Sequence, residues 1–179
     1  MNLANKLTLL RVALVPVFVA SFYLSVAGWN YIAAAIFVGA YITDILDGHY
    51  ARKYGKITDF GKLLDPIADK LLTTSALIML VWWGRLSPII AIIIIGRELM
   101  ISGFRLIALD KGKVIAASLL GKIKTVSQCV AIVLVLMENP VFSLIGIPMD
   151  QIAVYLATAI TIWSGVDYVY KNRKMIKAF

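Results

Sequence analysis

The chain has 179 residues, of which 61% are hydrophobic and 16% are charged, and its mean hydropathy is +0.87. This composition excludes an ordinary water-soluble domain and is typical of a membrane protein. The formal net charge of +8 does not call for a nucleic-acid partner, because basic residues gather in the cytoplasmic loops of membrane proteins and beside anionic headgroups. We therefore predict a single integral membrane domain over residues 1–179.

Six hydrophobic segments come close to the length of about 20 residues that crosses a bilayer core of about 30 Å. They cover residues 7–25, 31–46, 69–83, 88–107, 121–141 and 152–170. The sequence predicts an all-α integral membrane protein with six transmembrane helices, the second of which continues as a cytoplasmic helix. Residues 2–10 are expected to form a short interfacial helix before the first span. That first span is expected to be retained, since Arg11 interrupts the apolar run of a signal peptide.

The charged residues divide between the two ends of these segments. The connections near 26–30, 84–87 and 138–151 carry a single basic residue, Arg85, and most of the other lysines and arginines flank the opposite ends. The positive-inside rule then places both termini in the cytoplasm.

Carboxylates gather at or near the cytoplasmic ends of the second and third predicted spans. Helical spacing places Asp44 and Asp47 on one side of one helix, and Asp65 and Asp69 on one side of the next. Charged groups at membrane depth are costly, so they face a partner, a cavity or an ion. An oxygen-only set suits magnesium or manganese. The lack of a histidine cluster argues against zinc, and the lone His49 has an ordinary packing or solvated role.

Small residues share the acidic faces of both helices. Gly48, Ala51 and Gly61 fit either a close approach of two helices or space for a flat ligand, such as a nucleobase, beside the metal ions. The spacing does not decide between these two interpretations. Cys129 stands alone, which excludes a disulfide framework.

The run Asp44-x2-Asp47-Gly48-x2-Ala51-Arg52-x8-Gly61-x3-Asp65-x3-Asp69 resembles the complete signature of the CDP-alcohol phosphotransferase family, with no departure at a fixed position. The segments NLANKLTLLRVALVPVF, FGKLLDPIADKLL, GRELMISGFR and GKIKTVSQ resemble the bacterial phosphatidylglycerophosphate synthase branch. That branch joins CDP-diacylglycerol to glycerol 3-phosphate and releases CMP. The resemblance covers nearly the whole chain.

The resemblance implies a role for each position of the signature. Asp44, Asp47 and Asp65 would bind two Mg²⁺ or Mn²⁺ ions, and Asp69 would lie near these ions and act as the general base for the acceptor hydroxyl. The CDP pocket would consist of Asp44, Gly48, Ala51, Arg52 and Gly61. For Arg52, the alternative is an ordinary arginine at a cytoplasmic helix end.

A phosphorylated acceptor requires a second, basic subsite. The candidates are Arg97, Arg105, Lys122 and Lys124. Arg97 lies inside a predicted span, where an ionisable residue is a functional candidate, although Glu98 or a helix end is an alternative partner. For the other three residues, cytoplasmic flanking charge is an equal alternative.

Further polar residues flank these two groups. Lys62 and Lys70 either join the site or extend to the headgroups. Asn5, Thr8 and Arg11 resemble the opening of the same branch, which makes them candidates for contacts near donor or acceptor.

The partners that follow are CDP-diacylglycerol, glycerol 3-phosphate, membrane lipids and, by resemblance, a second copy of the chain. The resemblance also implies a polar active-site cavity facing the cytoplasm at the bacterial inner membrane. Inositol phosphate, serine and phosphatidylglycerol are alternative acceptors. A divalent-cation transporter is the alternative from another class, because intramembrane carboxylates also mark ion paths. Against it, the acids gather at one membrane face, and the two halves show no inverted repeat.

Overall fold

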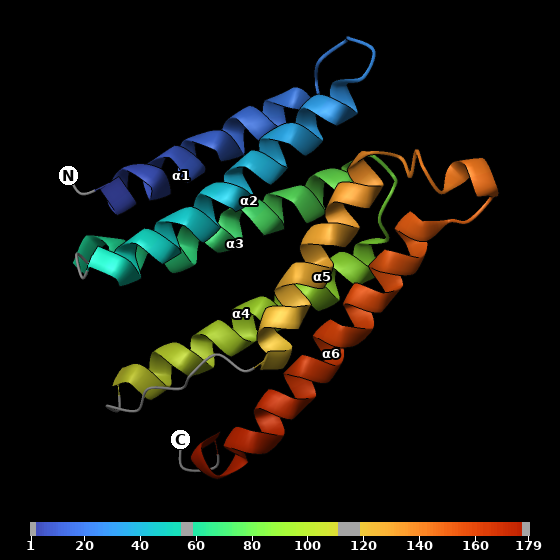
Figure 1. Cartoon of the computed structure of the whole chain (residues 1–179). Helices are drawn as coiled ribbons and strands as arrows, with labels where there is room; N and C mark the ends of the chain where they lie inside the picture. Colours follow the sequence, from blue (N-terminus) through green and yellow to red (C-terminus); the bar gives the residue numbers. More distant parts are fainter. Residues whose placement is uncertain (1–2, 55–58, 111–118, 177–179) are drawn as a thin grey trace. The chain divides into compact units, whose positions relative to one another are not determined.

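A computed structural model describes residues 3–54, 59–110 and 119–176; the side chains at 3–7, 44–54, 59–66, 69, 109–110 and 174–176 fall outside this description. The described residues form six α-helices and one short 3-10 helix without a strand, which confirms the all-α prediction (Figure 1). The chain divides into two compact units, Met1–Arg85 and Leu86–Phe179. One domain over 1–179 stays a prediction.

The first unit contains three helices: α1 (Leu3–Ser21), α2 (Trp29–Tyr54) and α3 (Asp59–Trp82). Helix α1 packs against both α2 and α3, and α2 also contacts α3 (Figure 1). Phe18 on α1 is fully buried, and its ring centroid lies 5.9 Å from that of Phe37 on α2. Their contact fixes the position of α1 along α2.

Aromatic rings gather where α1, α2 and α3 meet at one end of this unit. The Trp29 ring lies 4.9 Å from both Phe22 and Trp83, and the Arg85 guanidinium stands 5.0 Å above the Trp83 ring. The backbone N–H of Arg85 donates to the Leu80 carbonyl oxygen at 3.0 Å. Gly84, at φ +76°, supplies the left-handed conformation that this helix-ending turn requires.

The N-terminal part of the prediction needs correction. Residues 3–10 belong to the same continuous helix α1 as the rest of the first apolar segment, so they form no separate interfacial helix. No glycine or proline interrupts the chain before Pro16, and Thr8 and Arg11 are buried on the same face as Phe18. The helix ends at Ser21 instead of residue 25.

The second unit contains α4 (Pro88–Asp110), α5 (Leu119–Leu136), the 3-10 helix η1 (Ser143–Ile145) and α6 (Met149–Ile176). Helix α6 packs against both α4 and α5. Helix α5 ends at Leu136, five residues before the predicted boundary at 141. It ends there because Glu138 and Asn139 adopt positive φ angles of 56° and 57°, and the Asn139 amide donates to the Ile147 carbonyl oxygen at 2.7 Å.

Two described helices are long and apolar enough to cross a membrane, over Leu119–Leu136 and Met149–Arg173. Shorter apolar stretches lie in the first unit, at Thr8–Ser21, Trp29–Thr43 and Lys70–Trp82. Helix α4 contains Arg97, Glu98 and Arg105, so it has more charged residues than a simple apolar span.

The outer faces of the helices are rich in large apolar side chains. Ile92 and Trp163 are each 70% exposed and Leu119 is 73% exposed. Apolar surface on this scale marks contact with lipid or with another protein. With the apolar helices, it supports a membrane protein.

Candidate active site

The acidic signature lies on the two halves of a helical hairpin. Asp44 and Asp47 belong to the C-terminal half of α2, and Asp65 and Asp69 belong to the N-terminal half of α3. Four residues separate the end of α2 from the start of α3. At a rise of 1.5 Å per residue, Asp47 and Asp65 lie about 10 Å from that connection and Asp44 and Asp69 about 15 Å from it. The two pairs therefore lie at matching heights on adjacent helices.

The signature positions on α2 follow the same helical spacing as the buried residues earlier in this helix. Phe37 and Ala40 are both buried, and the same alternating spacing of three and four residues leads to Asp44, Asp47 and Ala51. Such a spacing keeps positions on one helical face. The signature positions on α2 thus share the helical register of the buried Phe37 and Ala40.

On helix α3 the buried residues follow the signature positions instead of preceding them, with the same helical spacing. Leu72 and Ala76 are buried, and the spacing of three and four residues leads back from them to Asp69 and Asp65. Ala68, between these aspartates, is also fully buried. The side chains at all eight signature positions and at Lys62 fall outside the described residues. The predicted roles of these residues, including Gly48, Arg52 and Gly61, stay predictions.

Helix α1 brings two polar residues to the height of the α2 aspartates. Arg11 is fully buried and Thr8 is 1% exposed. Helices α1 and α2 run antiparallel from the contact between Phe18 and Phe37. Arg11 lies seven residues before Phe18, while Asp44 lies seven after Phe37, so each is about 10 Å along its own helix. By the same count, Thr8 is level with position 47. The side chain of Asn5 lies outside the described residues.

In the second unit, Arg97 joins α4 to α6. Its Nη2 donates a 2.6 Å hydrogen bond to Ser164 Oγ, and its Nη1 lies 3.4 Å from Glu98 Oε1. The Arg97 side chain is 13% exposed. Gly165 permits this contact, since a Cβ there would lie only 3.3 Å from Arg97 Cγ. An arginine held in this way inside an apolar helix pair is a candidate for binding an anion.

Lys124 reaches the same carboxylate from α5. Its Nζ forms an ion pair with Glu98 Oε1, and the residue is buried, with 4% exposed. About one turn further along α5, the Gln128 amide donates to Thr161 Oγ1 on α6 at 2.8 Å. Two cations thus share one carboxylate, which leaves net positive charge in a part of the unit that is poorly exposed to water. Lys122, in contrast, is exposed.

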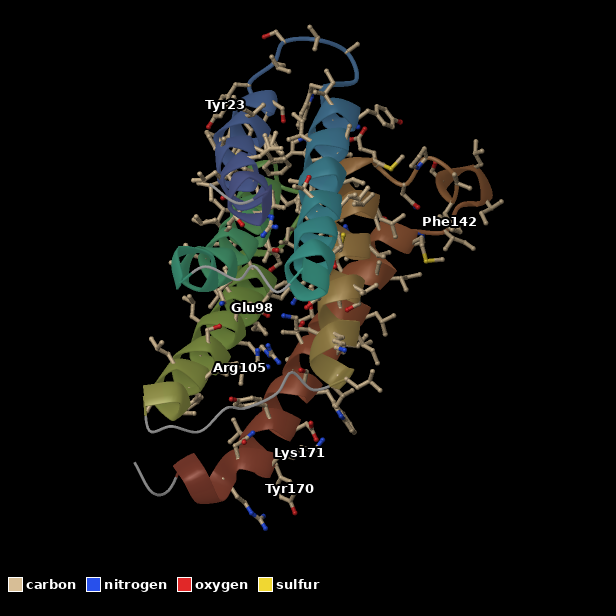
Figure 2. All side chains as sticks on the ribbon, turned by 60° about the vertical axis from the view of Figure 1, so that its left-hand side comes forward. Tyr23, Glu98, Arg105, Phe142, Tyr170 and Lys171 are labelled. Carbon is tan, nitrogen blue, oxygen red and sulfur yellow. The ribbon has the colours of Figure 1, made fainter. Side chains whose placement is uncertain are left out.

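Arg105 extends from α4 toward α6, as Figure 2 shows. Its guanidinium carbon lies 5.8 Å from the centre of the Tyr168 ring, a cation–π distance. Tyr168 is 5% exposed, and its hydroxyl has no hydrogen-bond partner among the described residues. A buried hydroxyl is costly to leave unpaired, so it is available to a ligand oxygen.

The sequence prediction missed the α6 side of this cluster. Thr161, Ser164 and Tyr168 are all buried and follow the same spacing of three and four residues along α6. Polar residues at successive buried positions of a long apolar helix are the signal that would have identified them. Their partners on α4 and α5 are not readable from the sequence.

The acidic donor set fits the metal ions that the signature implies. Four aspartates offer only oxygen ligands, which hard divalent cations prefer. Among the side chains that the structure describes, no group of three or more His, Cys, Asp or Glu residues could hold a metal ion.

Comparison with known proteins agrees with the signature and with the helical architecture. A model of the CDP-alcohol phosphatidyltransferase family matches residues 1–163. The chain belongs to this family.

Bacterial relatives match the chain over nearly its whole length. A Bacillus subtilis (strain 168) protein is 41% identical over 189 aligned positions, which cover 98% of this chain and 97% of that protein. Proteins from Rickettsia bellii and Sodalis glossinidius are each 38% identical, over 97% of this chain and 96% of theirs. All three are named CDP-diacylglycerol–glycerol-3-phosphate 3-phosphatidyltransferase.

Proposed function

We propose that this chain transfers the phosphatidyl group of CDP-diacylglycerol to glycerol 3-phosphate, giving phosphatidylglycerophosphate and CMP. The observation that carries the proposal is full-length similarity to relatives of that name in a chain whose acidic signature is complete. The matching heights of the aspartate positions on α2 and α3 support one shared site for these residues.

In the proposed reaction, the acceptor hydroxyl oxygen attacks the phosphorus on the diacylglycerol side of the pyrophosphate. Asp69 accepts the hydroxyl proton as general base, and the phosphorus–oxygen bond to CMP breaks. Asp44, Asp47, Asp65 and Asp69 would hold two divalent ions, Mg²⁺ or Mn²⁺. Such ions neutralise the pyrophosphate and stabilise the leaving CMP.

The CDP portion of the donor would lie along the signature face of the hairpin. Gly48, Ala51 and Gly61 leave space there for the nucleotide, and Arg52 donates to phosphate oxygens. On α1, Arg11 is buried at the height of position 44, where a guanidinium balances the charge of the carboxylates and of the donor phosphates.

The phosphate of glycerol 3-phosphate would bind to the basic cluster of the second unit. Arg97 supplies a forked donor, and Arg105 and Lys124 add positive charge. Glu98 and Ser164 hold Arg97 in position, and the Tyr168 hydroxyl can donate to a phosphate oxygen. The exposed Lys122 would attract the anionic acceptor rather than bind it at close range.

The proposed setting is the bacterial inner membrane. The six α-helices would each serve as a span of a single domain, with both termini and a polar cavity facing the cytoplasm, as the distribution of basic residues favours. The charges of α4 are compatible with a span because Arg97 and Glu98 pair with each other and with groups on α5 and α6. A homodimer is part of the same proposal.

The direct test is CMP release by purified, detergent-solubilised protein supplied with CDP-diacylglycerol and Mg²⁺. We expect release that depends on glycerol 3-phosphate and stops when EDTA removes the metal. Release that requires inositol phosphate, serine or phosphatidylglycerol instead would keep the reaction and replace the acceptor. Metal flux into sealed vesicles without any CMP release from folded protein would favour a transporter.

Arg11→Ala is expected to lower kcat by about 10- to 100-fold, because the variant would lose the contacts proposed between the guanidinium and the donor phosphates, and hydrogen bonds to charged groups contribute roughly 1.5–3 kcal/mol. Arg85→Ala is the matched control, since Arg85 lies exposed over Trp83 at the far end of α3. Steady-state kinetics with both substrates varied would measure the effect. Unchanged kinetics in Arg11→Ala would remove this residue from the site.

A further inference from the structure

An apolar groove runs between α4 and α6 on the surface of the second unit. Its volume is about 690 Å³, which lies within the usual range of ligand sites. The apolar lining consists mainly of Ile92, Ile93, Met100 and Ile101 on α4 and of Ile162 and Val166 on α6. No residue of the acidic signature takes part.

The groove has the length of one membrane leaflet. Its α6 wall extends from Ile162 to Arg173, and the rise between these two residues is roughly 16 Å. Half of a bilayer core of about 30 Å is close to this length. A single extended acyl chain therefore fits along the groove, from the bilayer centre to the headgroup level.

Two arginines line the groove: Arg97, which is held by Glu98 and Ser164, and Arg173 at the end of the α6 wall. Arg173 stands 4.5 Å above the ring of Tyr170, the residue labelled near the end of α6 in Figure 2. Among the described residues no carboxylate pairs with Arg173, whereas the neighbouring Lys171 is neutralised by Asp167 at 2.8 Å. Arg173 is thus the groove arginine that has no carboxylate partner among the described residues, which suits it to binding a lipid phosphate.

We infer that this groove holds a resident anionic phospholipid of the cytoplasmic leaflet, with one acyl chain between α4 and α6 and its phosphate on Arg173. The lipid is distinct from the substrates of the proposed reaction. The inference rests on the proposed membrane spans and not on the proposed acceptor, so it can fail or hold independently of the reaction.

Two glycines on α4 offer a matched pair of variants. Gly96 lines the groove, and a Cβ there would meet nothing within 4 Å, so Gly96→Leu fills the groove without a clash. Gly103 is equally open and lies outside the groove, which makes Gly103→Leu the control. Leucine also favours the helix over glycine, so neither substitution is expected to impair folding. Gly165 is unsuitable because its replacement would press on Arg97.

Native mass spectrometry of the solubilised chain, without nucleotide, would measure lipid retention. The probes are phosphatidic acid and phosphatidylcholine with identical acyl chains. We expect the unmodified chain to retain one phosphatidic acid in preference to phosphatidylcholine. Gly96→Leu should lose this adduct and Gly103→Leu should keep it. Arg173→Ala should reduce the preference about fivefold, the factor that one basic residue contributes near an anionic surface.

Three results would overturn the inference. Equal retention by the Gly96 and Gly103 variants would show that the lipid binds elsewhere. An unchanged preference in Arg173→Ala would remove the proposed phosphate contact. Displacement of phosphatidic acid by CDP-diacylglycerol but not by an equal amount of phosphatidylglycerol would assign the groove to the donor substrate. CMP release by the same preparations, measured separately, tests the proposed reaction.

Discussion

Asp69→Asn is expected to lower CMP release by about 10³-fold, within the range of 10²- to 10⁴-fold that general base catalysis contributes. Asparagine keeps the shape of the side chain but cannot accept the proton of the acceptor hydroxyl. It also removes one negative charge from the proposed metal site. The rate of CMP release under saturating glycerol 3-phosphate and CDP-diacylglycerol is the measurement.

Asp167→Asn is the matched control for this substitution. Asp167 lies on α6 and pairs with the exposed Lys171, so the same chemical change there should leave the rate nearly unchanged. If Asp69→Asn kept more than about a hundredth of the rate, its loss would fall below the range for a general base. Asp65 would then be the next candidate.

Arg97→Ala is expected to raise the KM for glycerol 3-phosphate by up to about 100-fold, since hydrogen bonds to charged groups contribute roughly 1.5–3 kcal/mol. The KM for CDP-diacylglycerol should stay the same, because the proposed donor contacts lie on the hairpin. Arg97→Lys should recover only part of the loss, as lysine lacks the forked geometry. Initial rates with each substrate varied would separate the two KM values.

A purely structural role for Arg97 would give a different result. Arg97 bonds to Ser164 and Glu98, so its removal also weakens the packing of α4 on α6. Ser164→Ala removes the same contact between the helices but keeps the guanidinium. If Ser164→Ala and Arg97→Ala reduced activity equally, with both KM values unchanged, Arg97 would support the fold and not bind the acceptor.

The hydrophobic runs predicted the six helices because burial and lipid exposure both require apolar residues. They did not predict the helix ends, which depend on local backbone conformation. Glu138 and Asn139 adopt the left-handed conformation, and neither residue type requires it. The continuity of α1 was also missed, because residues 2–10 were predicted to form an interfacial segment, whereas Thr8 within it is buried on the same face as Phe18.

The sequence predicted the acidic positions because their spacing within each helix is local information. The basic cluster depends on pairs far apart in the chain, such as Arg97 with Ser164, 67 residues away, and Lys124 with Glu98, 26 residues away. No local pattern reveals which residues of α4, α5 and α6 meet. Its position inside a predicted span marked Arg97 as a candidate, with Glu98 as one possible partner, but only the packed helices revealed that Ser164 also holds it.

The heights of Arg11 and Asp44 along α1 and α2 depend on the number of residues that separate each from the contact between Phe18 and Phe37. Arg11 and Asp44 are level only because equal numbers of residues separate them from Phe18 and Phe37. A one-residue deletion between Phe37 and Asp44 would rotate every later position of α2 by about 100° and take the signature out of register with Phe37 and Ala40. We expect substitutions in this interval to change local packing, whereas insertions and deletions would change the height and direction of Asp44 and Asp47 relative to α1 and α3.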